Sequence, residues 1–253
     1  MMKIGAQMYT VRDTCQDLNG FADTLARLAD MGFKVVQVSG TCAYEGEWLD
    51  EQLKKNGLEC AITHSPVLDT DPEILIEKHN KFNCEYIGLG YYSFKNNPYE
   101  EFESKVRPIV EKFKAAGKKF SYHNHSEEFL KINGENAIEK MMKAFDKDEM
   151  CFTLDTHWVH VSGADPVEWL EKLAGRVPCI HLKDIELYMK DDVKELRYAP
   201  VGSGNMNFNA ILAATEKAGV KYGLIEQDNC YGRDPFECLK ESLDYLRAKG
   251  FND

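Results

Sequence analysis

Eight short apolar runs alternate with longer stretches of helical periodicity, and this alternation restricts the fold more than any other feature of the chain. The runs are residues 4–9, 35–39, 60–64, 86–91, 120–123, 151–155, 179–183 and 222–226. The helical stretches carry apolar residues three or four positions apart, as at Phe21, Leu25 and Leu28. Strands that alternate with helices in this way predict an α/β fold with a parallel sheet.

The number of strands favours a closed barrel over an open sheet. Eight strand–helix units in 253 residues fit a (β/α)8 TIM barrel, which has an eight-stranded parallel barrel at its centre. The alternative is a doubly wound open sheet, whose dinucleotide-binding members carry GxGxxG after the first strand. That motif is absent, and we expect Gly202-Ser203-Gly204 to form a tight loop. We predict a single domain over residues 1–253, with its longest connections at 124–133 and 184–206.

Charge and hydropathy bear on the partners and the location of the protein. The mean hydropathy is −0.45, and no apolar run approaches the roughly 20 residues of a membrane helix, so we expect no membrane partner. The net charge of −11 argues against nucleic acid, which requires a basic face. The first residues resemble a strand rather than a signal peptide, and the 8 cysteines are spread singly. We therefore expect reduced thiols and a cytoplasmic location.

Polar and ionisable residues gather where the apolar runs end. In a (β/α)8 barrel, the active site lies at the carboxyl ends of the strands. Five of the seven histidines occupy these ends, and two carboxylates accompany them. The residues are His64, His123, His125, Asp155, His157, His181 and Glu226.

Four of these residues form a candidate metal site. His123, Asp155, His181 and Glu226 follow four different strands, so their side chains are expected to converge on one mouth of the barrel. Two imidazoles and two carboxylates suit Mn²⁺, Co²⁺, Fe²⁺ or Zn²⁺ better than Ca²⁺. We predict one divalent metal ion, with Mn²⁺, Co²⁺, Zn²⁺ and Mg²⁺ as candidates. The alternative is a buried hydrogen-bond network without metal.

The chain resembles the xylose isomerase-like TIM barrels, also known as the sugar phosphate isomerase/epimerase superfamily. The resemblance runs nearly end to end and rests on the order and spacing of several segments. They include Tyr122-His123-Asn124-His125, Leu154-Asp155, His181-Leu182-Lys183-Asp184 and Ile225-Glu226-Gln227-Asp228. The resemblance implies a metal held by Glu, Asp, His and Glu, of which Asp155, His181 and Glu226 carry over. His123 stands where many relatives have the first Glu, which argues against a mechanism with two glutamate bases.

The resemblance and the metal site together imply carbonyl chemistry. A divalent ion polarises a carbonyl, a base removes the neighbouring proton, and the ion stabilises the resulting negative charge. Glu226 is our first candidate for the base, and His125 or Glu128 is the second. Lys183 would hold or protonate a substrate oxygen; its alternative role is a salt bridge to an aspartate such as Asp184.

Further residues are candidates for substrate binding. Trp158 would form an apolar wall for a sugar, or else it would pack at a subunit contact. Arg197, in the long connection after the seventh strand, would reach an anionic group or remain solvated. No glycine-rich phosphate cradle is evident, so we expect an unphosphorylated sugar or polyol. The complete candidate set is His64, His157, Trp158, Tyr9 and Arg197.

Several functions agree with these patterns. The leading hypothesis is a metal-dependent isomerase or epimerase of a small sugar or keto-sugar. The alternative is a dehydratase or lyase that acts by β-elimination on the same barrel. A non-catalytic sugar-binding barrel and an abasic-site endonuclease are less favoured, the latter because the chain is acidic. A homodimer or homotetramer is compatible with each hypothesis.

Overall fold

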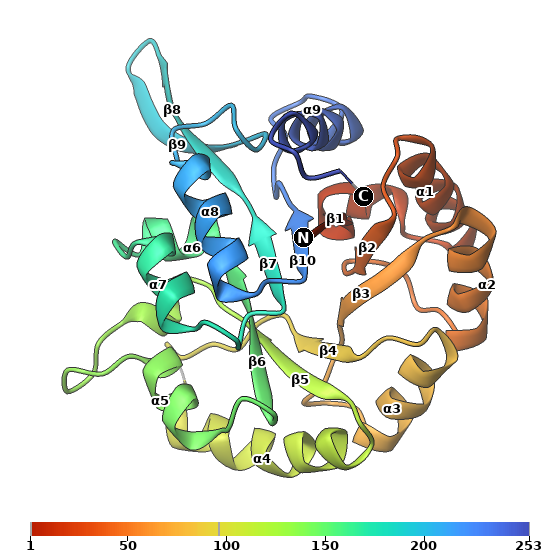
Figure 1. Ribbon diagram of the computed structural model, residues 1–253, viewed down its shortest axis with the longest axis vertical. Helices are drawn as coiled ribbons and strands as arrows, with labels where there is room; N and C mark the ends of the chain where they lie inside the picture. The colour runs from red at the N-terminus through yellow and green to blue at the C-terminus, as the bar shows by residue number, and fades with distance from the viewer. Residues whose placement is uncertain (1, 96, 253) are drawn as a thin grey trace.

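The computed structural model, which describes residues 2–95 and 97–252, contains a closed barrel of eight parallel strands (Figure 1). Around the barrel the strand order is β1-β10-β7-β6-β5-β4-β3-β2. The predicted (β/α)8 barrel is therefore confirmed. The strands are β1 Lys3–Gln7, β2 Val35–Val38, β3 Glu59–His64, β4 Tyr86–Leu89, β5 Lys119–His123, β6 Met150–Asp155, β7 Cys179–Leu182 and β10 Tyr222–Ile225.

The first strand is shorter than expected. The sequence predicted a strand over residues 4–9, but β1 ends at Gln7 and a 3-10 helix, η1 (Met8–Thr14), follows it. The Gln7 side chain accepts a hydrogen bond from the Tyr9 backbone N–H, which caps this helix. Tyr9 therefore lies in the first turn after the strand.

Helices surround the barrel because each has one apolar face (Figure 1). In α1, the buried residues Phe21, Leu25 and Leu28 form that face. Helices α2 and α8 both end at a glycine in the left-handed conformation, Gly57 and Gly219, as their C-caps. The helices are α1 Leu18–Asp30, α2 Gly46–Asn56, α3 Pro72–Lys81, α4 Tyr99–Ala115, α5 Ala137–Ala144, α6 Thr156–Val161, α7 Pro166–Lys172, α8 Phe208–Ala218 and α9 Pro235–Ala248.

Strand alternation places the polar residues inside the barrel. Along β6, Phe152 and Leu154 belong to the large apolar cluster that joins barrel and helices, whereas Cys151 belongs to a smaller cluster with residues from β2, β3, β4, β7 and β10. Since successive side chains alternate, Thr153 and Asp155 share the inner face with Cys151. The inner face is thus apolar near the amino end of β6 and ionisable at its carboxyl end.

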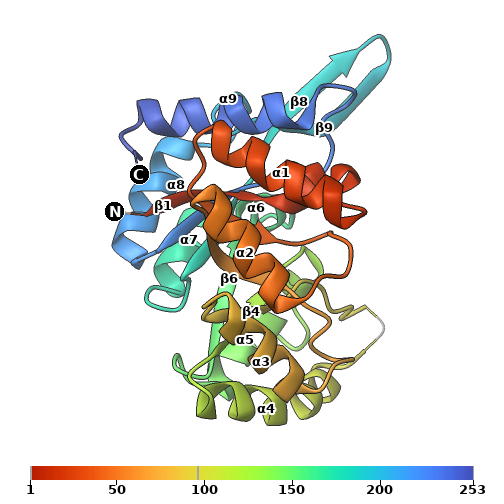
Figure 2. The same ribbon diagram turned by 90° about the vertical axis from the view of Figure 1, so that its right-hand side faces the viewer.

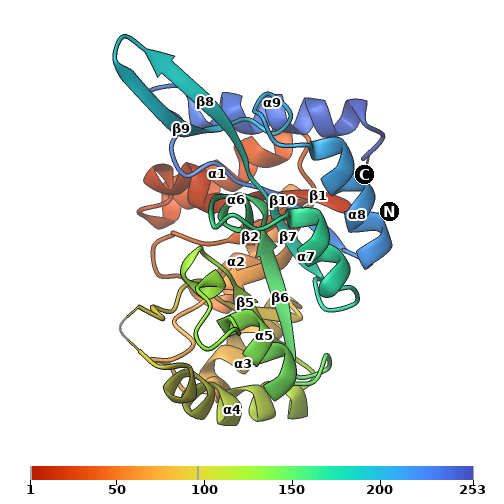
Figure 3. The same cartoon turned by 90° about the vertical axis from the view of Figure 1, so that its left-hand side faces the viewer.

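A β-hairpin extends from the barrel between β7 and α8. Strands β8 (Asp184–Lys190) and β9 (Val193–Ala199) pair antiparallel within the connection predicted over 184–206. Figures 2 and 3 show the hairpin projecting from the end of the molecule opposite the chain termini. This hairpin was not predicted from the sequence.

Among residues 2–95 and 97–252, no helix combines the length and the apolar character required to cross a membrane.

Candidate active site

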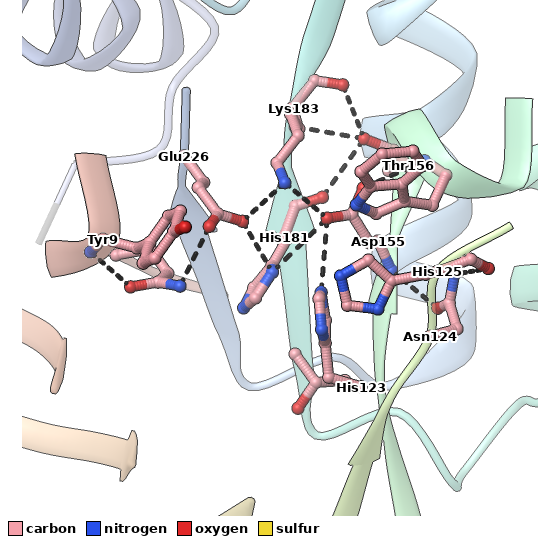
Figure 4. Close-up of polar contacts among 12 residues, drawn as sticks. Tyr9, His123, Asn124, His125, Asp155, Thr156, His181, Lys183 and Glu226 are labelled. Atoms are coloured by element: carbon pink, nitrogen blue, oxygen red, sulfur yellow. Dashed lines mark hydrogen bonds and ion pairs between the residues drawn. The ribbon is translucent and has the colours of Figure 1, made fainter. Parts of the chain in front are cut away.

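The four predicted metal ligands lie together at the carboxyl ends of β5, β6, β7 and β10, and we refer to them as the metal-ligand group. One ligand atom from each of His123, Asp155, His181 and Glu226 lies within 4.8 Å of the others, and all four residues are buried. Figure 4 shows their imidazoles and carboxylates pointing toward one another. Asp155 Oδ2 is 3.3 Å from His123 Nε2 and 3.5 Å from His181 Nδ1, which is 2.9 Å from Glu226 Oε2.

The outer nitrogen of each imidazole is held by an oxygen. Nδ1 of His123 donates to the carbonyl oxygen of Gly90 at 2.9 Å, and Nε2 of His181 donates to Gln37 Oε1 at 2.8 Å. In the neutral imidazoles, the inner nitrogens therefore carry lone pairs that face the carboxylates. Such outer-nitrogen bonds fix the tautomer and the ring orientation of metal-binding histidines.

Lone pairs that face carboxylates at these distances require a positive charge between them. Burial lowers the pKa of His181, but Glu226 and Asp155 outweigh this effect and raise it to about 9. Between the nitrogens and the carboxylates, this positive charge is either a proton on His181 or a metal ion; the Lys183 ammonium contacts the same oxygens from another side. Nδ1 of His181 has no hydrogen-bond partner in the described part of the chain, and two nitrogens with two carboxylate oxygens suit a divalent transition metal. The residues present thus fit such an ion.

Lys183 lies beside the same carboxylates. Its Nζ is 2.9 Å from Asp155 Oδ2, 2.9 Å from Glu226 Oε2 and 3.0 Å from Asp228 Oδ1. Burial raises the pKa values of Asp155 and Glu226, but Lys183 together with the neighbouring histidines outweighs burial and lowers both pKa values. The carboxylates are therefore ionised.

Asp184, the alternative partner considered for Lys183, has a different role. Its Oδ2 accepts backbone N–H bonds from Gly202 and Gly204, and its Oδ1 accepts them from Ile185 and Met206. Asp184 thus fixes the tight loop predicted at 202–204.

A cavity of about 580 Å³ opens above the metal-ligand group. Five predicted residues other than the four metal ligands line it: His64, His125, Trp158, Tyr9 and Lys183. Nε2 of His64 and Nδ1 of His125 are buried and have no hydrogen-bond partner within the described residues. Burial, and next the neighbouring His123, lowers the pKa of His64 and brings that of His125 to about 3. Both imidazoles are therefore neutral, with a ring nitrogen available to a ligand.

Three predicted site residues outside the four metal ligands do not line this cavity. Glu128 is fully buried and accepts hydrogen bonds from the Tyr122 hydroxyl at 2.6 Å and the His125 backbone N–H at 2.9 Å. His157 packs against the Tyr198 ring, with 4.6 Å between ring centres. Arg197 lies on the hairpin, forms an ion pair with Glu195 and stacks on the Tyr188 ring.

Other residues of the site were not predicted. Gln37 orients His181, and Asp228 contacts Lys183 and lines the cavity. Asp69 and Tyr91 also line it. Gln37 interrupts an otherwise apolar strand, and Asp228 follows Glu226 by two positions, just beyond the end of β10. Both residues therefore had a recognisable signal in the sequence.

Comparison with known proteins gives the family of the chain. The family model described as the xylose isomerase-like TIM barrel matches residues 25–249. The chain belongs to this family.

Two curated relatives are both named inosose dehydratase. One, from Mesomycoplasma hyopneumoniae (strain J), is 27% identical, and the alignment covers 98% of this chain and 96% of the relative. The other, from Lacticaseibacillus casei, is 24% identical over 61% of this chain and 56% of the relative, so that match spans about half of the relative's length.

A solved structure is similar throughout. The crystal structure of a sugar phosphate isomerase/epimerase from Parabacteroides distasonis ATCC 8503 superposes with a TM-score of 0.82 and 23% identity. The match covers 100% of this chain and 96% of that one. At this identity the similarity supports the fold.

Proposed function

We propose that this protein is a divalent-metal-dependent enzyme that removes a proton next to the carbonyl of a small, uncharged keto-sugar or keto-polyol. The observation that carries the proposal is the group of four ligand atoms within 4.8 Å at the floor of a cavity. A bound divalent ion would polarise a carbonyl and stabilise the negative charge that develops on its oxygen. The protein's own residues supply the base, the acid and the substrate contacts.

Glu226 is our first candidate for the base. Its Oε1 accepts a hydrogen bond from Gln7 Nε2 at 3.0 Å, while Oε2 faces the metal-ligand group, and the residue lines the cavity. Lys183 donates protons from the same side, and neutral His125 offers a ring nitrogen from another. Glu128 is covered by Tyr122 and His125, so we assign it to supporting His125 rather than to proton transfer.

The lining of the cavity favours an uncharged substrate. Among the described residues that line it, Lys183 is the single lysine or arginine, and its ammonium already contacts three carboxylates. Asp69, Glu226 and Asp228 add negative charge to the wall. A phosphate or carboxylate group would be repelled here, whereas sugar hydroxyls would bond these side chains and stack on Trp158.

After the proton is removed, the substrate can react in two ways. Return of the proton to the neighbouring carbon gives an isomerase, and its return to the opposite face of the same carbon gives an epimerase; isomerase or epimerase is our leading assignment. Loss of a β-hydroxyl gives a dehydratase, which the names of the curated relatives favour. His123 also favours elimination over two-base epimerisation, because Nδ1 is held by Gly90 and no carboxylate stands at this strand end.

Metal content and solvent exchange test the proposal. We expect about one transition metal per chain by mass spectrometry, lost in Glu226→Ala and retained in Glu77→Ala on the exposed face of α3. Unphosphorylated keto-sugars and keto-polyols are then incubated with the loaded protein in D₂O. Deuterium uptake without loss of water supports isomerisation, and loss of water supports elimination. No metal in the purified protein, and no uptake of Mn²⁺, Co²⁺ or Zn²⁺, would overturn the proposal.

A further inference from the structure

The ammonium of Lys183 contacts two carboxylate oxygens that belong to the metal-ligand group. Asp155 Oδ2 and Glu226 Oε2 face the histidine nitrogens on one side and Lys183 Nζ on the other. Figure 4 shows Lys183, which directly follows β7, reaching toward both carboxylates. Its side chain is only 2% exposed, so little water shields the ammonium from an ion in the same group.

The balance of charges indicates where the Lys183 ammonium would move if a divalent ion were bound. Asp155 and Glu226 carry two negative charges, which one divalent ion neutralises without help from Lys183. The ammonium would then lack a counter-charge, but Asp228 Oδ1 already lies 3.0 Å from it. Asp228 is 22% exposed and lines the cavity, so an ammonium that moves toward it moves toward the substrate.

We propose that Lys183 holds the carboxylates of Asp155 and Glu226 when no metal is bound and shifts to Asp228 when the metal enters. Lys183 is thus a positioning residue that keeps the ligands assembled without metal and weakens metal binding. Metal loading also presents its ammonium to the cavity. The inference rests on the proposed metal site, because it concerns an ion bound by the same two carboxylates.

Metal affinity of Lys183 variants tests the competition. Chelator-treated full-length protein is titrated with Mn²⁺ by calorimetry, and circular dichroism confirms folding. We expect Lys183→Met to bind Mn²⁺ at least tenfold more tightly than the wild type, with Lys183→Gln changing in the same direction. Lys118→Met is the matched control: its ammonium is also buried but donates to the carbonyl oxygen of Cys84. Its Mn²⁺ affinity should equal that of the wild type.

A second pair of variants tests the shift to Asp228. Asp228→Asn removes the charge that would receive the ammonium, so it should weaken Mn²⁺ binding in the wild-type background. In the Lys183→Met background the same substitution should have little effect, because no ammonium has to move. An equal loss in both backgrounds would mean that Asp228 attracts the ion directly, and would overturn the shift.

The outcomes separate this inference from the proposed function. Mn²⁺ binding that is equal or weaker in Lys183→Met contradicts the competition but leaves the metal site standing. No binding of Mn²⁺, Co²⁺ or Zn²⁺ by the wild type or by any lysine variant contradicts the metal site itself. Tighter binding in Lys183→Met with the background-dependent effect of Asp228→Asn supports both.

Discussion

At the scale of single residues, the site depends on groups that orient the two histidines. Gly90 and Gln37 each accept a hydrogen bond from the outer nitrogen of an imidazole, so both inner nitrogens face the carboxylates. A side chain at Gly90 would also disturb this geometry, because a Cβ there would lie 2.8 Å from His64 Nδ1. The residues around the predicted ligands therefore help to fix the geometry of the site.

Replacement of Gln37 tests this orientation. Gln37→Leu preserves volume but removes the acceptor for His181 Nε2, so the ring is freed and its buried N–H loses its partner. We expect Mn²⁺ affinity to fall by about 10–100-fold, as measured by calorimetry. Gln16→Leu, on the exposed surface, serves as the control. An affinity unchanged in Gln37→Leu would contradict the orienting role.

Glu128 predicts a pH dependence of stability. Burial raises its pKa to about 7, whereas the unfolded chain has the ordinary value of 4.5. Between these values the unfolded state has lost the proton and the folded state retains it, so stability falls as pH rises from 4.5 to 7. The loss is of the order of 3 kcal/mol. It is absent below pH 4.5 and complete above pH 7.

Glu128→Gln should remove this contribution, because glutamine is neutral in both states and retains an oxygen that accepts hydrogen bonds. Thermal unfolding of both proteins at pH 5 and pH 8 measures the effect. We expect the variant to gain stability relative to the wild type at pH 8. An equal difference in stability between the two proteins at pH 5 and pH 8 would show that the Glu128 carboxyl is already ionised in the folded protein at pH 5.

The residues of the site differ in how far sequence could predict them. The ligands sit at strand ends, where period-two alternation and barrel closure fix both position and direction, and the structure brings all four together. Glu128 and His157 lie just beyond the strands, in a 3-10 turn and a short helix where that alternation no longer applies. Their direction depends on packing against Tyr122 and Tyr198, which no local pattern contains.

At the scale of elements, Asp184 joins the hairpin to the loop before α8. Its carboxylate accepts four backbone N–H bonds, and Gly204 packs so closely that a Cβ would lie 2.3 Å from the Ile185 carbonyl oxygen. The hairpin leaves the barrel directly after Lys183. Asp184 therefore fixes the backbone beside the metal-ligand group.

Asp184→Ala should consequently destabilise the protein. Several N–H groups would lose their acceptor in a mostly buried region, at a cost of about 2 kcal/mol or more. Urea unfolding measures the loss. Asp192→Ala, at the exposed tip of the hairpin, should leave the midpoint unchanged. Equal midpoints for the two variants would contradict the anchoring role.

The hairpin of β8 and β9 is secondary structure that was not predicted from the sequence. Ile185, Leu187 and Met189 alternate with polar residues, which is typical of a strand, and Asp191 adopts the positive φ of a tight turn. The alternation was present in the sequence but weak, whereas the positive φ of Asp191 is seen only in the structure. The barrel strands were predictable because burial on both faces makes each a nearly continuous apolar run.

At the scale of the whole molecule, the hairpin presents an apolar face to solvent. Leu187 and Leu196 are cross-strand partners on that face, with Met189 beside them, and their exposed fractions are 46%, 58% and 67% respectively. Contiguous exposed apolar side chains often mark an association surface. We propose that this face packs against a second copy of the chain, an assembly compatible with the homodimer or homotetramer that the sequence left open.

Light scattering after size exclusion tests this assembly. We expect the wild type to be a dimer or tetramer and the double variant Leu187→Glu/Leu196→Glu to be a monomer, because paired charges cannot be buried on a shared apolar face. Val193→Glu, on the opposite face of the hairpin, should keep the wild-type mass. A monomeric wild type would contradict the proposal.

The pairing of the first and last barrel strands has a consequence for synthesis of the chain. Lys3 of β1 pairs with Tyr222 of β10, and Glu226 follows that last strand. The ribosome releases the chain from its amino end, so the barrel cannot close until β10 has been synthesised and pairs with β1. His123, Asp155 and His181 emerge earlier and are joined by Glu226 only after β10 has been synthesised. If these four residues bind the proposed ion, barrel closure would also act as a timer for its uptake, because the complete set of ligands exists only after β10 pairs with β1.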